Sequence, residues 1–137
     1  DDYFRRPPPK STGFEHFNLD WLHNHDVAGL DPADVQATLL ELTARSLANA
    51  VDAAAPDCSS LFVCGGGVHN TALVGRIRAL LQPADVESTA SRGLDPDWVE
   101  ASAFAWLARE RMSGRVGNLP GVTGASRPSS LGAVYRL

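Results

Sequence analysis

The amino-acid sequence predicts an α/β fold that is rich in helix and has a short, partly parallel sheet. Two Asp-Pro pairs, at Asp31-Pro32 and Asp95-Pro96, open long segments with apolar residues at helical spacing. Between them, residues 61–64 form a short continuous apolar run, as in a buried parallel strand. Helices that alternate with such strands are typical of α/β proteins, and the small number of strands fits part of a larger molecule.

Residues 1–30 are expected to form a connector. Three consecutive prolines, Pro7 to Pro9, fix φ and lack N–H donors, so they predict an extended or polyproline-like segment. A short apolar cluster at 17–22 predicts one or two helical turns. We therefore predict a connector and cleft segment over 1–30 and a folded C-terminal part over 31–137.

The first long helix begins at Asp31, which is suited to cap it, with Pro32 at the first helical position. Two apolar stripes run along this helix and predict burial around much of its circumference. Pro56 ends it. The strand at 61–64 comes next, and Asn70 then caps a second helix, before a short strand near 84–89.

The second Asp-Pro pair predicts a helix from about 96 to 111, which Gly114 ends. Trp98 and Trp106 are expected to pack in the core. Residues 117–132 are rich in Gly, Pro, Ser and Thr and predict a loop, followed by a short closing element at 131–135.

Composition excludes several classes of protein. The formal net charge is −4 and lysine and arginine form no cluster, which argues against nucleic acid as a partner. No apolar run approaches the roughly 20 residues that a membrane span needs. Cys58 and Cys64 are too few for a disulfide framework and indicate reduced cytosolic thiols. The chain begins with Asp1 and its one methionine is Met112, so we expect a piece of a longer protein.

Three glycines, Gly65, Gly66 and Gly67, directly follow the predicted strand at 61–64. Without side chains they let the backbone approach a ligand closely, and the N–H groups and dipole of the next helix favour a negative charge there. A nucleotide fits this chemistry, with His69 or Asn70 against its base or ribose. A tight turn that binds nothing is the alternative, and the residues alone leave both open.

Two other functions are compatible with the same residues. Gly65 and Gly67 match the first two glycines of a dinucleotide-binding turn, and Glu87 lies at the spacing of its acid, but Asn70 replaces the third glycine. An NAD-type dinucleotide-binding domain therefore remains an alternative. The broadly apolar helix at 31–55 suggests a third possibility, a non-catalytic dimerisation module.

Glu100 shares a helical face with apolar residues, where a carboxylate is costly to bury without a partner. It either reaches solvent at the edge of that face or orients a hydroxyl or a water in a cleft. Lys10 and Ser11 follow the prolines and are suited to an anion or a polar ligand, although a plain connector has the same composition. His23 and His25 are two apart with no further ligand nearby, and we predict no metal site.

Six segments in this order resemble the anhydro-N-acetylmuramic acid kinase family. The resemblance covers about Tyr3 to Tyr135, and each segment alone is a weak signal. The segments read RPPPKSTG, FNLDWL, DVQATLLELTA, FVCGGGVHN, GLDPDWVEASAFAWLA and NLPGVTGAS.

The resemblance implies one ribonuclease-H-like lobe of an actin-like ATPase fold, in which two lobes hold ATP and Mg²⁺ between them. It implies a cytoplasmic bacterial enzyme, a homodimer in full-length form, that opens the 1,6-anhydro ring hydrolytically and phosphorylates the amino sugar for cell-wall recycling. Residues 31–137 would be its C-terminal nucleotide-binding lobe. Nucleic acid and membranes are not expected partners.

The matching motifs imply roles for individual residues. Those expected at the adenosine side of ATP are Gly65, Gly66, Gly67, His69 and Asn70. Glu100 would position the sugar or the attacking water, and Lys10 and Ser11 would lie near the cleft between the lobes. The family's first phosphate-binding loop and its general-base aspartate have no counterpart in this chain. We therefore expect the chain alone to be inactive.

Overall fold

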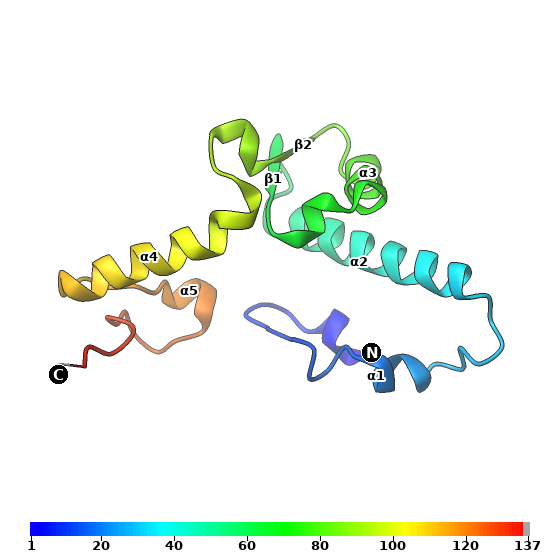
Figure 1. Cartoon of the computed structure of the whole chain (residues 1–137), viewed down its shortest axis with the longest axis horizontal. Coiled ribbons are helices and arrows are strands. Elements are labelled where there is room, and N and C mark those ends of the chain that lie inside the picture. Colours follow the sequence, from blue (N-terminus) through cyan, green and yellow to red (C-terminus); the bar gives the residue numbers. More distant parts are fainter. Residues whose placement is uncertain (136–137) are drawn as a thin grey trace. The chain divides into compact units, whose positions relative to one another are not determined.

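The computed structural model describes residues 1–135, which group into two compact units. The first unit contains residues 1–11 and the described residues from 98 on, and the second unit contains residues 12–97. The predicted α/β character is confirmed, because helices dominate and the sheet consists of two parallel strands (Figure 1). The division into a connector over 1–30 and a lobe from 31 is a functional one and stays a prediction.

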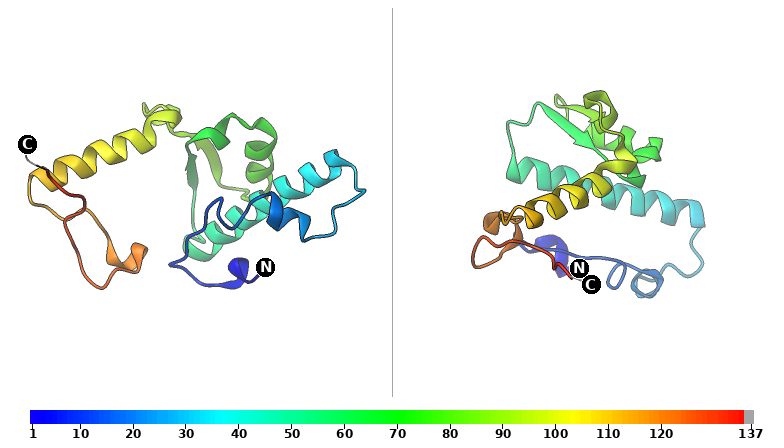
Figure 2. Two further views of the ribbon diagram at one scale, coloured as in Figure 1. Left: turned by 60° about the horizontal axis from the view of Figure 1, so that its bottom comes forward. Right: turned by 60° about the vertical axis from the view of Figure 1, so that its left-hand side comes forward.

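Helix α2, Pro32–Ala54, is the longest element of the second unit and begins as predicted. The Asp31 side chain accepts a hydrogen bond from the Ala33 N–H at 2.8 Å, and Pro32 occupies the first helical position. Only Ala44 and Ala48 of this helix are buried, so the prediction of burial around much of its circumference is wrong. The helix packs against α3 along one side, and its other side chains are half-buried or exposed (Figure 2).

A strand–helix–strand unit follows α2. It consists of β1 (Ser60–Val63), α3 (Thr71–Leu80) and β2 (Asp85–Ser88), and the two strands pair in parallel from Ser60↔Asp85 to Val63↔Ser88. Alternate β1 side chains, at 61 and 63, pack onto the core. Phe62 points to the other face and is 36% exposed, so the strand is half-buried on one face and is not the buried strand that was predicted. The buried core consists of Ala44, Ala48, Ile77, Leu81 and Val86.

An ion pair joins α2 to α3 beside this core. Arg76 Nε donates to Glu41 Oε2 at 2.6 Å and Arg76 Nη2 donates to Glu41 Oε1 at 2.7 Å, which is a bidentate pairing. Arg45, one turn along α2, donates to the same carboxylate. The Arg76 hydrogen bond is the main reason that the pKa of Glu41 falls from 4.5 to about 2.

We expect this pairing to make stability depend on acid pH. The folded pKa of Glu41 lies below its ordinary value, so the unfolded chain binds more protons between about pH 4.5 and pH 2. The contribution is complete above pH 4.5 and is lost as the pH falls towards 2. Urea unfolding at pH 7 and pH 3 measures it: Glu41→Gln lowers the midpoint at pH 7 and lessens its fall between the two pH values. An equal fall in both proteins would contradict the assignment.

The first unit is built around helix α4, Val99–Met112, which the 3₁₀ turn Pro96–Trp98 precedes. Asp95 Oδ1 accepts the Asp97 N–H at 2.9 Å at this start, and Gly114, with φ of +67°, follows the helix end as predicted. Trp98 and Trp106 are 64% and 47% exposed, so the prediction that they pack in the core is wrong. The described residues of the first unit do not cover these two side chains.

Two side chains shape the segment after α4. Glu110 is buried and accepts two hydrogen bonds from the Arg115 guanidinium, at 2.5 and 2.8 Å, which lowers the pKa of Glu110. Asn118 binds the other end of the following loop: its Oδ1 accepts the Ser129 N–H at 2.6 Å and its Nδ2 donates to the Arg127 carbonyl at 3.2 Å. These two hydrogen bonds of Asn118 therefore hold the two ends of the loop predicted at 117–132 together.

The remaining elements are short. Within the predicted loop lies helix α5, Pro120–Thr123, and residues 131–135 form no helix or strand where a closing element was predicted. The predicted helical turns after the prolines are α1, Leu19–His23, and two 3₁₀ turns, Asp2–Arg5 and Thr89–Arg92, were not predicted. Along residues 1–135, every helix is too short or too polar to cross a lipid bilayer.

Candidate functional site

The turn after β1 has a backbone that requires glycine at its first position. Gly65 has φ of +74° and ψ of −178°, a region that is essentially restricted to glycine. Its N–H donates to the Pro96 carbonyl at 2.9 Å, which fixes the turn against the 3₁₀ turn before α4. The sequence therefore has glycine here because the conformation itself demands it.

The three glycines do not lead directly into α3. Gly66 and Gly67 begin a 3₁₀ turn, Gly66–His69, that precedes the helix, which corrects the expectation that the free N–H groups of α3 follow the glycines. The reason is Asn70, which has an extended backbone and caps α3 by accepting the Leu73 N–H on its Oδ1 at 3.0 Å. The 3₁₀ turn therefore ends at His69, the cap is Asn70, and α3 begins at Thr71. The Asn70 Oδ1 is engaged, and its Nδ2 group carries the two N–H donors that can face a ligand.

The space beside the glycines is open. A Cβ atom placed on Gly65, Gly66 or Gly67 would meet no atom within 4 Å. No side chain of the described residues therefore fills the volume directly above this backbone. This is the arrangement that a close approach between backbone and ligand needs.

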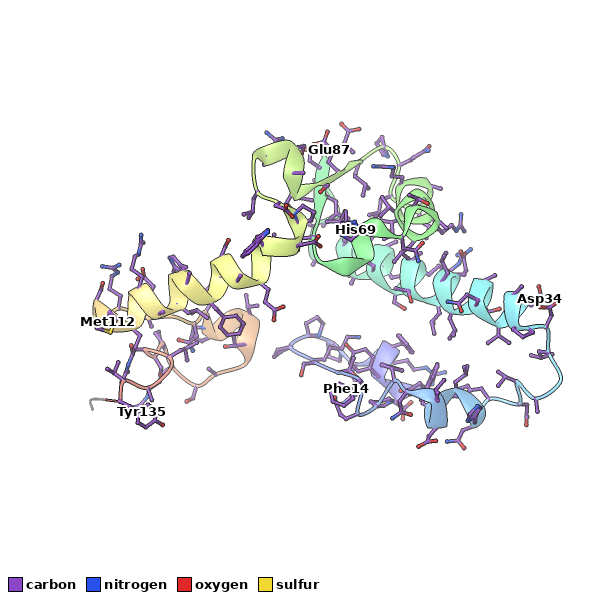
Figure 3. The ribbon with its side chains drawn as sticks, in the orientation of Figure 1. Phe14, Asp34, His69, Glu87, Met112 and Tyr135 are labelled. Atoms are coloured by element: carbon purple, nitrogen blue, oxygen red, sulfur yellow. The ribbon has the colours of Figure 1, made fainter. Side chains whose placement is uncertain are left out.

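His69 is held by a partner that the sequence analysis did not identify. Its Nε2 lies 2.9 and 3.0 Å from the two carboxylate oxygens of Asp97, and both side chains are more than half exposed. A carboxylate only accepts hydrogen bonds, so Nε2 is the donor in this pair, and in the matching neutral tautomer Nδ1 is an acceptor. Figure 3 shows His69 on the turn after β1. The two residues are 28 positions apart, and only the tertiary fold brings them together.

The carboxyl ends of β1 and β2 lie at the same edge of the sheet, as parallel pairing dictates. Ligands of open α/β sheets bind at this edge. Beyond β2, the Thr89 Oγ1 is buried and has no hydrogen-bond partner among the described residues. Glu87, the acid of the dinucleotide alternative, lies in β2 (Figure 3), and its carboxylate accepts the Ser91 hydroxyl at 2.8 Å.

The other candidate residues belong to the first unit. Glu100 lies in the first turn of α4 and is exposed, so its carboxylate does not bear the cost of burial. Lys10 Nζ donates to the Tyr3 carbonyl at 3.0 Å and lies 4.7 Å from the centre of the Tyr3 ring, which engages its charge within the chain. Ser11 is exposed. The glycine turn is in the second unit, so these three roles stay predictions.

The described residues offer no metal cage. Over residues 1–135, no three His, Cys, Asp or Glu side chains are grouped so as to hold an ion. His25 Nδ1 lies 2.8 Å from the Trp21 carbonyl. Mg²⁺ in nucleotide sites is commonly held by one or two carboxylates together with the phosphates, and here Asp97 is engaged by His69 and Glu87 by Ser91. These residues do not fit a preformed magnesium site.

The Asn70 cap can be tested separately from ligand binding. Asn70→Ala removes the acceptor for the Leu73 N–H and is expected to lower the free energy of unfolding by about 1 kcal/mol. Asn70→Asp retains an acceptor oxygen, and we expect its stability to match that of the parent chain. Urea unfolding followed by far-ultraviolet circular dichroism measures both variants. Equal losses in both would show that the cap is not what matters at this position.

Comparison with known proteins gives one consistent result. The model of a family described as anhydro-N-acetylmuramic acid kinase matches residues 1–137. A protein named anhydro-N-acetylmuramic acid kinase from Coxiella burnetii (strain Dugway 5J108-111) is 51% identical over 136 residues. A protein of the same name from Xanthomonas oryzae pv. oryzae (strain MAFF 311018) is 56% identical over 136 residues. Each match covers 98% of this chain, which spans 37% and 36% of the length of these two relatives.

Proposed function

This chain belongs to the anhydro-N-acetylmuramic acid kinase family, and we propose that it forms the C-terminal nucleotide-binding part of such an ATP-dependent kinase. In the whole enzyme, 1,6-anhydro-N-acetylmuramic acid is opened by water at its anomeric carbon. The γ-phosphoryl group of ATP passes to the O6 that the opening releases, which gives the 6-phosphate sugar and ADP.

The proposed fold is a ribonuclease-H-like lobe of an actin-like ATPase. Its support is the parallel β1–α3–β2 unit, with the glycine turn at the carboxyl edge of the sheet. We further propose that the full-length protein is a homodimer in the bacterial cytoplasm. Its substrate there is an amino sugar released from the cell wall.

The adenosine side of ATP is proposed to lie over the glycine turn. The observation that carries this proposal is the open volume above Gly65, Gly66 and Gly67, where the bare backbone can contact a flat base or a ribose. His69 Nδ1 would accept a hydrogen bond from a ribose hydroxyl or an exocyclic amine in the tautomer whose Nε2 donates to Asp97. Asn70 Nδ2 supplies donors to the same ligand.

The sugar side is proposed to involve the first unit. Glu100 would position the sugar or the attacking water, and its exposure leaves the carboxylate accessible. Lys10 and Ser11 would line the cleft. Any Mg²⁺ would come with ATP, where it would supply positive charge to the phosphates, and we assign no residue of this chain to hold it. The general base and the first phosphate-binding loop are not supplied by this chain.

The test compares this chain with an extended protein. The extended protein joins residues 1–137 to the part of the Xanthomonas oryzae relative that lies outside the matched segment. We expect it to phosphorylate the anhydro sugar and the chain alone to give no turnover. Robust turnover by the chain alone, or a folded extended protein that does not bind ATP, would contradict the proposal.

Site residues are tested in the extended protein. Asn70→Asp keeps the helix cap but removes two donors and adds a negative charge, so ATP affinity is expected to fall by roughly tenfold or more. Glu100→Gln is expected to lower kcat with little change in the KM for ATP. NAD provides the contrast with the dinucleotide alternative, and tight NAD binding with no ATP binding would favour that alternative.

A further inference from the structure

The centre of helix α4, residues 103–108, is apolar on all sides, yet most of it is uncovered. A helix with this pattern is normally buried in the core of a larger protein. Its central residues are nevertheless exposed in the described part of the chain, with Phe104 at 63% and Trp106 at 47%, and the alanines around them are exposed as well. This pattern predicts a covering layer that the described residues of the first unit do not provide.

An apolar groove runs beside the C-terminal half of α4. It has a volume of about 430 Å³ and lies between the helix and residues 131–134. Phe104 and Met112 line it from the helix, and Leu131 and Val134 line it from the opposite side, each more than 40% exposed. Met112 lies at the end of α4 (Figure 3). Exposed apolar surface of this kind marks a contact with another polypeptide.

The groove has one cation and no carboxylate among its lining residues. Arg111 lines it and donates to the Ser130 hydroxyl at 3.4 Å. An occupant therefore needs apolar side chains and gains little from charge. A second copy of the chain would bring the same concave groove in a twofold contact, and two concavities do not fill each other.

The length of the relatives identifies a better occupant. The segment that matches this chain is 37% of the Coxiella relative, so most of that polypeptide lies outside the matched segment. We propose that the α4 surface, defined by Phe104, Trp106 and Met112 with the adjoining groove, is the docking face for this remaining polypeptide. Apolar side chains of that part fill the groove and complete the core around α4. This packing does not depend on whether the whole protein is a kinase.

Labelling of an introduced cysteine tests the proposal. Met112→Cys is made with Cys58→Ser and Cys64→Ser, and maleimide reacts with it in the chain alone and in the extended protein. We expect labelling to slow by about 100-fold or more in the extended protein, where reaction requires local opening. The control is Asn49→Cys, on an exposed position of α2, which labels at the same rate in both proteins. No nucleotide or sugar is present, so the result is independent of the proposed kinase activity.

Thermal unfolding provides the second readout. Phe104→Ala is expected to lower the Tm of the extended protein by roughly 5–15 °C. In the chain alone the side chain is exposed, and the shift is expected to be about 2 °C or less. If the extended protein does not fold, both substitutions are made at the aligned positions of the Xanthomonas oryzae relative itself.

Two results would overturn the proposal. The first is equal labelling of the introduced cysteine in the short and the extended protein. The second is protection in the chain alone that grows with protein concentration, which would identify a second copy as the occupant.

Discussion

Gly65→Ala lowers the free energy of unfolding of the second unit by about 1–3 kcal/mol, because alanine is strained in the backbone conformation of this residue. The conformation has φ of +74° and ψ of −178°, and the Gly65 N–H bond to Pro96 holds it. Relief of the strain would require the turn to move away from Pro96. Urea unfolding followed by far-ultraviolet circular dichroism gives the loss directly.

Gly66→Ala is the matched control. It lies in the 3₁₀ turn, and an added Cβ meets no atom within 4 Å, so stability is expected to stay within about 0.5 kcal/mol of the parent. The added methyl group nevertheless occupies the volume proposed for adenosine. In the extended protein we therefore expect weaker ATP binding with unchanged stability. Equal losses of stability from both substitutions would show that the turn is constrained by packing and not by its φ and ψ.

Ile77→Ala is expected to cost about 2–5 kcal/mol of the free energy of unfolding. Ile77 lies in α3 at 3% exposure and packs in the small core that joins α2, α3 and β2. Truncation leaves a cavity in a core of only five buried residues among those described, so the remaining side chains have few partners with which to fill it. Because small domains are stable by only about 5–15 kcal/mol, this is a large share of the total.

Two variants calibrate that loss. Ile77→Val removes one methylene and is expected to cost about 0.5–1.5 kcal/mol. Leu30→Ala truncates a side chain that is 56% exposed and is expected to stay within about 0.5 kcal/mol. The free energies come from urea unfolding at pH 7. A cost for Ile77→Ala no greater than that for Leu30→Ala would mean that this core does not hold the second unit together.

Features encoded by neighbouring residues were predictable from the sequence. Asp31 and Asn70 cap helices at the predicted positions because a cap involves atoms two or three residues apart. The first of the two parallel strands was predicted from a short apolar run, and Gly114 ends α4 as its turn chemistry indicates. The glycine turn was recognised from three consecutive residues.

Features that depend on distant residues were not predictable. Nothing local pairs His69 with Asp97, or Glu41 with Arg76, because the residues of each pair are 28 and 35 positions apart. Trp98 and Trp106 were expected in a core because bulky aromatic side chains are usually buried, but the described residues of the first unit leave both exposed. The Gly65 N–H and the Pro96 carbonyl that it binds are likewise 31 positions apart.

The β1–α3–β2 unit also has a consequence for the order of folding. Its two strands pair across a single intervening helix, and the residues that meet are 25 positions apart, as in Ser60↔Asp85. Contacts between residues close in sequence lose little chain entropy on forming, and they form early. We expect this unit to be the nucleus of the transition state, with φ-values highest for substitutions in α3, and α4 to join last.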